Sequence, residues 1–227
     1  MKTKVFNLII LDESGSMSCI KSQALSGLNE TLQTIRMAQE KYPDQQQIVS
    51  IVPFESGNIR LLRDKEPISE VKDLRPEEYN PGACTPLYDA IGFGIQSIRK
   101  HVTDDDSVLV TIITDGLENS SCEYSGKAIA MIIDELKQKG WMFTYIGANQ
   151  DAVEVARTMN INNALNFVQD DEGTARMFLK ERRSRDRFMF ESASLCCMVS
   201  SEEARAERIK MANSCNFFDD IDEDENV

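Results

Sequence analysis

The sequence predicts an α/β fold with a doubly wound, mostly parallel central sheet and helices on both of its faces. The first observation is a set of nearly continuous apolar runs, such as residues 5–11 and 107–114, which are typical of strands buried on both faces. The second is that stretches with apolar residues at helical spacing, such as residues 18–41, separate these runs. Strands that alternate with helices of this length indicate parallel pairing through helical crossovers.

The individual elements follow from the same two patterns. The expected strands are residues 5–11, 47–54, 107–114, 141–146 and 164–168, and the expected helices are residues 18–41, 86–100, 125–139, 150–159 and 173–187. Residues 58–62 are expected to form one short antiparallel edge strand, because the Ser56-Gly57 link is too short for a parallel crossover. Residues 64–84 are polar and contain several prolines, so we expect mostly loop with a short helix.

The chain of 227 residues is long enough to bury a substantial core. We expect one domain over residues 1–187 and a partly helical extension over residues 188–218, with Ser201 capping a short helix at 201–211. Residues 219–227 are strongly acidic and are expected to be disordered.

The composition argues against several classes of function. A net charge of −13 disfavours binding to a phosphate backbone, so we expect no nucleic acid partner. No apolar run approaches the roughly 20 residues that span a bilayer, and the N-terminal stretch is a poor match to a signal peptide. We therefore expect a cytoplasmic protein that does not associate with membranes. One basic cluster is interpreted as a solvated helix face: Lys180, Arg182, Arg183, Arg185 and Arg187.

Six cysteines and one histidine, with no Cys-x-x-Cys pair, argue against a zinc site. In a reducing cytosol the cysteines are expected to be free thiols that pack as small buried hydrophobes.

Oxygen-bearing side chains gather at three places that this architecture brings to one edge. Ligands bind such sheets at the carboxyl ends of the strands, where the strand order reverses. This rule points to the residues after Leu11 and after Thr114, and the loop before Pro86 is long enough to reach the same edge. Two carboxylates and three hydroxyls lie at these three places: Asp12, Ser14, Ser16, Thr85 and Asp115. Hard oxygen donors suit Mg²⁺, with Mn²⁺ or Ca²⁺ as further possibilities, and two carboxylates neutralise a divalent ion.

Each of these residues also has an ordinary structural interpretation. Asp12 could cap a helix with the serines as turn residues, Thr85 could be the residue that caps the helix at Pro86, and Asp115-Gly116 could be a plain turn. The residues expected at the rim of the site, where a partner would bind, are Glu13, Met17, Cys84, Glu118 and Asn119. Asp89 is expected to orient the loop rather than to bind metal.

The pattern Asp12-x-Ser14-x-Ser16, with Thr85 and Asp115, resembles the metal-ion-dependent adhesion site of von Willebrand factor A (vWA) domains. The resemblance covers roughly residues 3–184 and includes Thr-Pro-Leu-Tyr-Asp at 85–89 and Ile-Thr-Asp-Gly at 113–116 in the family's order. Residues 114–119 and 145–151 further resemble stand-alone bacterial vWA proteins, including those encoded near tellurium-resistance genes.

The resemblance implies the Rossmann-like vWA fold and a specific use of the metal. The serines and the threonine would bind the ion directly or through water. Whether each aspartate binds it directly or through water would depend on the state of the site. An open coordination position would accept an Asp or Glu carboxylate from a partner protein. In the family, the threonine and the second aspartate exchange as direct ligands of the metal, and this exchange switches the affinity for the partner. For this chain, such an exchange between Thr85 and Asp115 is a hypothesis.

The leading functional hypothesis is therefore a metal-dependent protein-binding module that is not an enzyme. The sequence has no evident nucleophile–base constellation and no phosphate-binding Gly-x-x-x-x-Gly-Lys loop. The alternative is a Mg²⁺-dependent hydrolase or phosphotransferase with Asp12 as nucleophile. Haloacid-dehalogenase-like phosphatases carry a second Asp two residues later, where this chain has Ser14, a poor acid or base. A third hypothesis is a structural domain that has lost metal binding.

Overall fold

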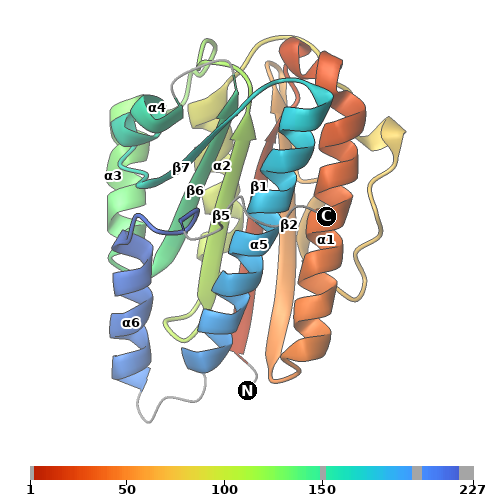
Figure 1. The fold of residues 1–227 in the computed structure, drawn as a ribbon. Coiled ribbons are helices and arrows are strands. Elements are labelled where there is room, and N and C mark those ends of the chain that lie inside the picture. The colour runs from red at the N-terminus through yellow and green to blue at the C-terminus, as the bar shows by residue number, and fades with distance from the viewer. Residues whose placement is uncertain (1–2, 149–151, 196–200, 220–227) are drawn as a thin grey trace.

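The computed structural model describes residues 3–148, 152–195 and 201–219, and a β-sheet forms its centre (Figure 1). The strands lie in the order β3-β2-β1-β5-β6-β7, and β4 also pairs with β2. The strands that pair in parallel are β1 (Thr3–Asp12), β2 (Gln45–Glu55), β5 (Ser107–Thr114), β6 (Trp141–Ala148) and β7 (Asn163–Phe167). Every residue of β5 and β6 is buried, which is why these segments appear in the sequence as continuous apolar runs.

Two short strands pair antiparallel with β2 at the edge of the sheet. The expected one is β3 (Asn58–Ile59), and β4 (Arg63–Pro67) lies partly in the stretch predicted to be loop. The strand β4 was missed because its sequence, RDKEP, has neither apolar alternation nor β-branched residues. The short helix expected in the same stretch is η2 (Pro76–Glu78).

Helices cover both faces of the sheet, as predicted. One face carries α1 (Lys21–Lys41) and α5 (Asp171–Leu195), and the other carries α2 (Leu87–Arg99), α3 (Gly126–Lys137) and α4 (Ala152–Thr158) (Figure 1). Alternate side chains of β1 enter the two halves of the core: Ile9 and Leu11 face α1, and Leu8 and Ile10 face α2. None of the helices in the described parts of the chain is long and apolar enough to cross a bilayer.

The C-terminal part of the chain differs from the prediction in one respect. The helix expected to end at Arg187 continues to Leu195, so the expected domain boundary at 187/188 falls inside α5. The added turns are helical because Phe188, Met189 and Leu195 continue the buried face of the helix. The helix expected at 201–211 is α6 (Ser201–Asn213). The expected helix start at residue 150 and residues 220–227 of the acidic tail lie outside the described residues.

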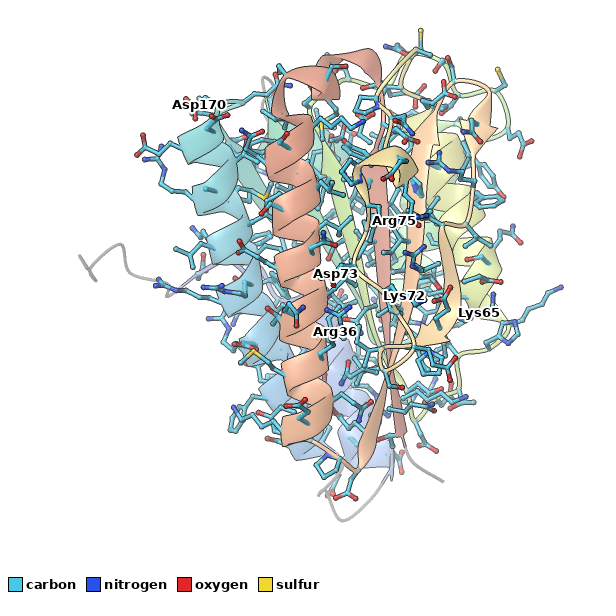
Figure 2. All side chains as sticks on the ribbon, turned by 90° about the vertical axis from the view of Figure 1, so that its right-hand side faces the viewer. Arg36, Lys65, Lys72, Asp73, Arg75 and Asp170 are labelled. Carbon is cyan, nitrogen blue, oxygen red and sulfur yellow. The ribbon has the colours of Figure 1, made fainter. Side chains whose placement is uncertain are left out.

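The long loop between β4 and α2, which leads to Thr85, is attached to α1 along its length. The Asn29 side chain accepts a hydrogen bond from Leu74 N at 2.7 Å and donates one to Leu74 O at 3.1 Å. Arg36 forms an ion pair with Asp73 at 2.8 Å, and Figure 2 shows both side chains between the helix and the loop. The loop therefore reaches the carboxyl edge of the sheet as a fixed segment.

Two expectations about side-chain exposure are wrong. Arg185 is not on a solvated helix face: it is 1% exposed and pairs with Glu181, because this part of α5 faces polar positions of the sheet rather than solvent. Four cysteines are exposed rather than buried: Cys84, Cys122 and Cys215 lie on loops, and Cys19 lies on the exposed side of a short 3₁₀ helix. Cys196 and Cys197 lie outside the described residues.

Candidate metal centre

Asp12 is the last residue of β1 and the most deeply buried of the predicted metal ligands, with no exposed side-chain surface. Its Oδ1 atom accepts a hydrogen bond from Ser14 N at 2.7 Å, and its Oδ2 atom accepts one from Thr114 Oγ1 at 2.5 Å. The Tyr79 hydroxyl donates to the Asp12 backbone oxygen at 2.7 Å. The carboxylate is therefore held in place at the point where β1 and β5 end side by side.

The two serines connect the loop after β1 to the loop after β5. The chain turns at Ser14 into η1 (Gly15–Ile20), and the two serine hydroxyls share a hydrogen bond of 3.2 Å. Ser16 Oγ then donates to Asp115 Oδ1 at 2.7 Å. The strand order reverses between β1 and β5, so these contacts lie at the crevice where the fold class predicts a ligand site.

Thr85 reaches the same point from the third loop. Its backbone is held by Asn119, whose side chain accepts from Thr85 N at 2.8 Å and whose N donates to Thr85 O at 3.2 Å. Its hydroxyl forms no hydrogen bond with any other described residue. A Cβ atom placed on Gly116 would lie 3.0 Å from Thr85 Oγ1 and 3.8 Å from Asp12 Oδ2, so both oxygens border the space that this glycine leaves open.

The carboxylates have little compensation for their charge. Burial raises the pKa of Asp12 from 3.8 to about 6, although hydrogen bonds from Thr114 and Ser14 lower it in part and the charge of Asp115 raises it further. Burial also raises the pKa of Asp115, against hydrogen bonds from Ser16 and Gln169. No lysine or arginine in the described chain contributes to either shift. A bound cation would supply the missing positive charge.

The donor set fits a hard divalent cation. It consists of two carboxylates and three hydroxyls, and one of these hydroxyls, on Thr85, has no partner in the described chain. No three His, Cys, Asp or Glu side chains converge on one point within residues 3–148, 152–195 and 201–219, so the set is not one that zinc prefers. Few protein oxygens, with room for water or a foreign ligand, are typical of Mg²⁺ sites.

Two of the residues expected at the rim do not lie there. The Met17 side chain is fully buried, because η1 turns it into the core beneath the site. Glu13 is 2% exposed and forms an ion pair with Arg60, because its side chain points back toward the loop that precedes Thr85. Both residues support the site from inside and cannot contact a partner.

The other expected rim residues lie near the surface. Cys84 is exposed, and its backbone is tied to Ser56 by hydrogen bonds of 3.0 and 3.1 Å. Asn119 is exposed and fixes Thr85, whereas Glu118 is half-buried and accepts hydrogen bonds from backbone N atoms of Tyr88, Ser120 and Ser121. Glu118 and Asn119 therefore order the loop after Asp115.

Asp89 has the orienting role that was expected from the sequence. It accepts hydrogen bonds from the backbone N atoms of Cys122, Glu123 and Tyr124 at 2.7–3.0 Å, and its side chain is buried. Together with Glu118 it holds the segment that follows Asp115 against α2.

Three residues of the site were not identified from the sequence. Gln169, in the connection from β7 to α5, donates to Ser16 O at 3.0 Å and to Asp115 Oδ2. Tyr79 donates a hydrogen bond to the backbone oxygen of Asp12, and Thr114 donates one to its carboxylate. Thr114 had a signal, since it is a hydroxyl residue at a strand end directly before Asp115, but nothing in the local sequence marks Gln169 or Tyr79.

No family model matches the sequence, and no curated protein is similar to it. Solved structures are similar in fold. The D319A mutant of the PilB minor pilin from Streptococcus sanguinis is 12% identical, with a TM-score of 0.57 over 84% of this chain and 63% of that one.

Two further solved structures are vWA domains by their descriptions. The vWF domain of the type V pili tip protein Mfa5 from Porphyromonas gingivalis is 9% identical, with a TM-score of 0.54 over 83% of this chain and 97% of that one. The SpRpn10 VWA domain is 8% identical, with a TM-score of 0.53 over 78% of this chain and 94% of that one. The chain spans less than two thirds of the PilB pilin but nearly all of these two domains. These likenesses show that the chain has a vWA-like α/β fold.

Proposed function

We propose that this chain is a metal-dependent protein-binding module that resembles stand-alone vWA proteins. A divalent cation, Mg²⁺ by preference, would be held by a complete metal-ion-dependent adhesion site: Asp12, Ser14, Ser16, Thr85 and Asp115. An open position on the ion would accept an Asp or Glu carboxylate of a partner protein.

The observation that carries the proposal is the convergence of two buried, unneutralised carboxylates and three hydroxyls from three separate loops. Asp12 and Asp115 are 0% and 5% exposed, and buried charges of one sign normally require pairing or a metal. Ser16, by contrast with the two aspartates, is exposed, so solvent or a partner can approach the site at this residue. A partner carboxylate would complete the coordination that the chain leaves open.

The arrangement supports protein binding better than catalysis by Asp12. Both carboxylate oxygens of Asp12 accept hydrogen bonds, and the side chain has no exposed surface from which to attack a substrate. A phosphatase screen with Mg²⁺ tests this choice. Activity that disappears in Asp12→Asn would replace binding with the hydrolase hypothesis.

Metal binding is tested by calorimetric titration with Mg²⁺ and Mn²⁺ and by thermal unfolding. We expect measurable heat and a melting temperature that rises with metal concentration, since a ligand at 100 times its Kd stabilises by about 2.7 kcal/mol. Asp115→Ala should abolish both signals. The matched control is Asp105→Ala, which removes an exposed carboxylate from a distant turn and should leave them unchanged. If the unaltered protein gives neither heat nor a shift in melting temperature, the remaining hypothesis is a structural domain that has lost metal binding.

Partner capture is tested by affinity purification from the cells that make the protein, with Mg²⁺ and with EDTA. We expect partners that are retained with Mg²⁺, lost with EDTA and lost in Asp115→Ala but kept in Asp105→Ala. An identical set of partners under all four conditions would show that recognition does not pass through the metal.

A further inference from the structure

A groove runs between the edge strand β7 and the first half of α5. It encloses about 240 Å³, and its apolar wall consists of Leu165, Phe167, Val168 and Met177. Val168 is 60% exposed, so part of this wall is open to solvent. Among the described strands, β7 pairs only with β6, and the groove therefore follows a free edge of the sheet. A segment from outside the sheet can lie in it.

The other wall of the groove carries positive charge that the chain does not neutralise. Arg176 and Lys180 line the groove, and none of the described lining residues is acidic. Arg176 pairs with Glu172 at 2.6 Å, whereas Lys180 is half-buried and forms no hydrogen bond or ion pair with any described residue. Because a partly buried charge is costly without a partner, Lys180 favours an anionic group in the groove.

The positive charge continues along α5 beyond the groove. Arg183 and Arg187 follow Lys180 at helical spacing, so the three cations share one face of the helix. Arg183 forms no ion pair with any described residue, and Arg187 donates only to backbone oxygens. The two carboxylates in this stretch point elsewhere, since Glu181 is buried in an ion pair and Asp186 lies toward the end of α1. This face of α5 therefore has an excess of positive charge.

The C-terminal segment of the chain leads directly to this face. Phe217 N donates to Asn163 Oδ1 at 3.0 Å, at the start of β7, and the Arg187 guanidinium donates to Asp219 O at 2.8 Å. The segment that follows α6 therefore lies between β7 and α5 (Figure 1). The described part of the chain ends here, beside the excess positive charge.

The residues that follow have the chemistry that complements the groove. Five of the eight residues at 220–227 are acidic, and Ile221 is apolar. Alternate side chains of an extended segment point to opposite sides, so Asp220, Asp222 and Asp224 would face one wall and Ile221 the other. Carboxylates two residues apart are separated by about 6.6 Å, close to the roughly 5–6 Å between successive cations on a helix face.

We propose that residues 220–227 bind in the groove between β7 and α5 of their own chain. The carboxylates pair with Lys180 and Arg183, and Ile221 packs on the apolar wall. Eight extended residues span up to about 26 Å, whereas Lys180 is two helical turns, about 10 Å, from Arg187. The tether gives the segment an effective concentration in the millimolar range. An acidic segment of another protein would have to displace it, so residues 220–227 control access to this surface.

A full-length variant with a neutral C-terminal segment tests the proposal. Two-dimensional amide NMR spectra of this variant and of wild type are compared in EDTA, so that the metal centre has no part in the result. We expect chemical-shift differences at Val168, Gly173, Met177 and Lys180. They should shrink as NaCl rises from about 0.1 to 1 M, because the Debye length falls from about 10 to 3 Å. The variant carries five substitutions: Asp220→Asn, Asp222→Asn, Glu223→Gln, Asp224→Asn and Glu225→Gln.

A competition experiment measures the same contact by affinity. A synthetic peptide with the sequence of residues 220–227 is titrated into both proteins. We expect it to bind the neutral variant about tenfold more tightly than wild type, where the attached segment competes. Adding Lys180→Gln to the neutral variant should weaken peptide binding about threefold, the effect of one partly exposed ion pair. Lys127→Gln, an exposed cation on α3 at the other face of the sheet, is the matched control and should change nothing.

Salt-sensitive shift differences at the groove, together with tighter peptide binding by the neutral variant, support the proposal. Spectra without differences at the groove, or equal affinity of the peptide for both proteins, would overturn it. Differences confined to Ser16, Asp115 and Gln169 would place the segment at the metal centre instead. Groove differences that grow with protein concentration would assign the groove to a second copy of the chain, which also contradicts binding within one chain.

Discussion

Two clusters of buried charged side chains, both at β1 and β5, differ in whether their charge is neutralised. In the middle of β1 and β5, Arg185 from α5 donates to Asn7 Oδ1 at 2.8 Å, to Thr111 Oγ1 at 2.9 Å and to Glu181. At the ends of the same strands, Asp12 and Asp115 have no cationic partner in the described chain.

The balance of buried charge distinguishes the two clusters. In the Arg185 cluster the positive and negative charges cancel, and each of the three guanidinium nitrogens donates a hydrogen bond, so the cluster needs no external ion. In the metal centre the negative charge exceeds what the chain supplies in compensation. We interpret this excess of buried negative charge at the carboxyl end of the sheet as the basis of the proposed cation site.

The largest expected effect comes from breaking the neutral cluster. Arg185→Met would leave Glu181 buried without its partner, and we expect the free energy of unfolding to fall by about 3–5 kcal/mol, measured by urea denaturation. Adding Glu181→Gln should recover much of the loss, since the unpaired charge is then removed. Arg183→Met, at an exposed position of the same helix, should change stability by less than about 0.5 kcal/mol. A similar loss in both single variants would mean that the buried pair has no special role.

The second prediction concerns Asp12, whose buried charge is expected to lower the stability of the folded protein. Because the pKa of Asp12 is raised from 3.8 to about 6 in the folded protein, protonation favours the folded state. In EDTA, the stability of wild type relative to Asp12→Asn should therefore rise as the pH falls from 7 through 6 to below 4, by up to about 3 kcal/mol. Asp105→Asn is the control and should show no such trend. If the difference in stability between wild type and Asp12→Asn does not change with pH, the charge of Asp12 does not destabilise the folded protein.

The third prediction concerns the space beside Gly116. Gly116→Ala would place a methyl group 3.0 Å from Thr85 Oγ1, and overpacking of about 1 kcal/mol at this point should weaken Mg²⁺ binding by roughly fivefold in a calorimetric titration. Gly82→Ala, in the loop before Thr85, meets nothing within 4 Å and should leave the affinity unchanged. Equal affinities for both variants would show that the metal does not use this space.

The smallest effect concerns backbone strain in the metal loops. Ala83 has a φ angle of 54°, in the left-handed region that favours glycine, and its oxygen accepts from Gly15 N at 3.1 Å. Ala83→Gly should stabilise the protein by about 0.5 kcal/mol in thermal or urea unfolding. Ala130→Gly, inside α3, should instead cost about 1 kcal/mol. A loss of stability in both would show that Ala83 is not strained.

The sequence alone determined the fold class, the order of its main elements and the set of residues that meets at one edge. The reason is local: apolar runs such as 107–114 reveal buried parallel strands, and residues that directly follow two such strands must share the carboxyl edge of the sheet. Asp12, Ser14, Ser16 and Asp115 are therefore joined by contacts that could be anticipated from spacing.

Which side chains face inward, and which residues reach the site from distant parts of the sequence, depend on how the helices and strands pack. Arg185 and Met17 are buried because the helix face that carries each of them meets the rest of the protein, and this contact cannot be read from the local sequence. Gln169 contacts Asp115 from the connection that follows β7, a proximity set by strand order alone. The groove beside Lys180 likewise forms where α5 passes β7, so no local pattern in either element could reveal it.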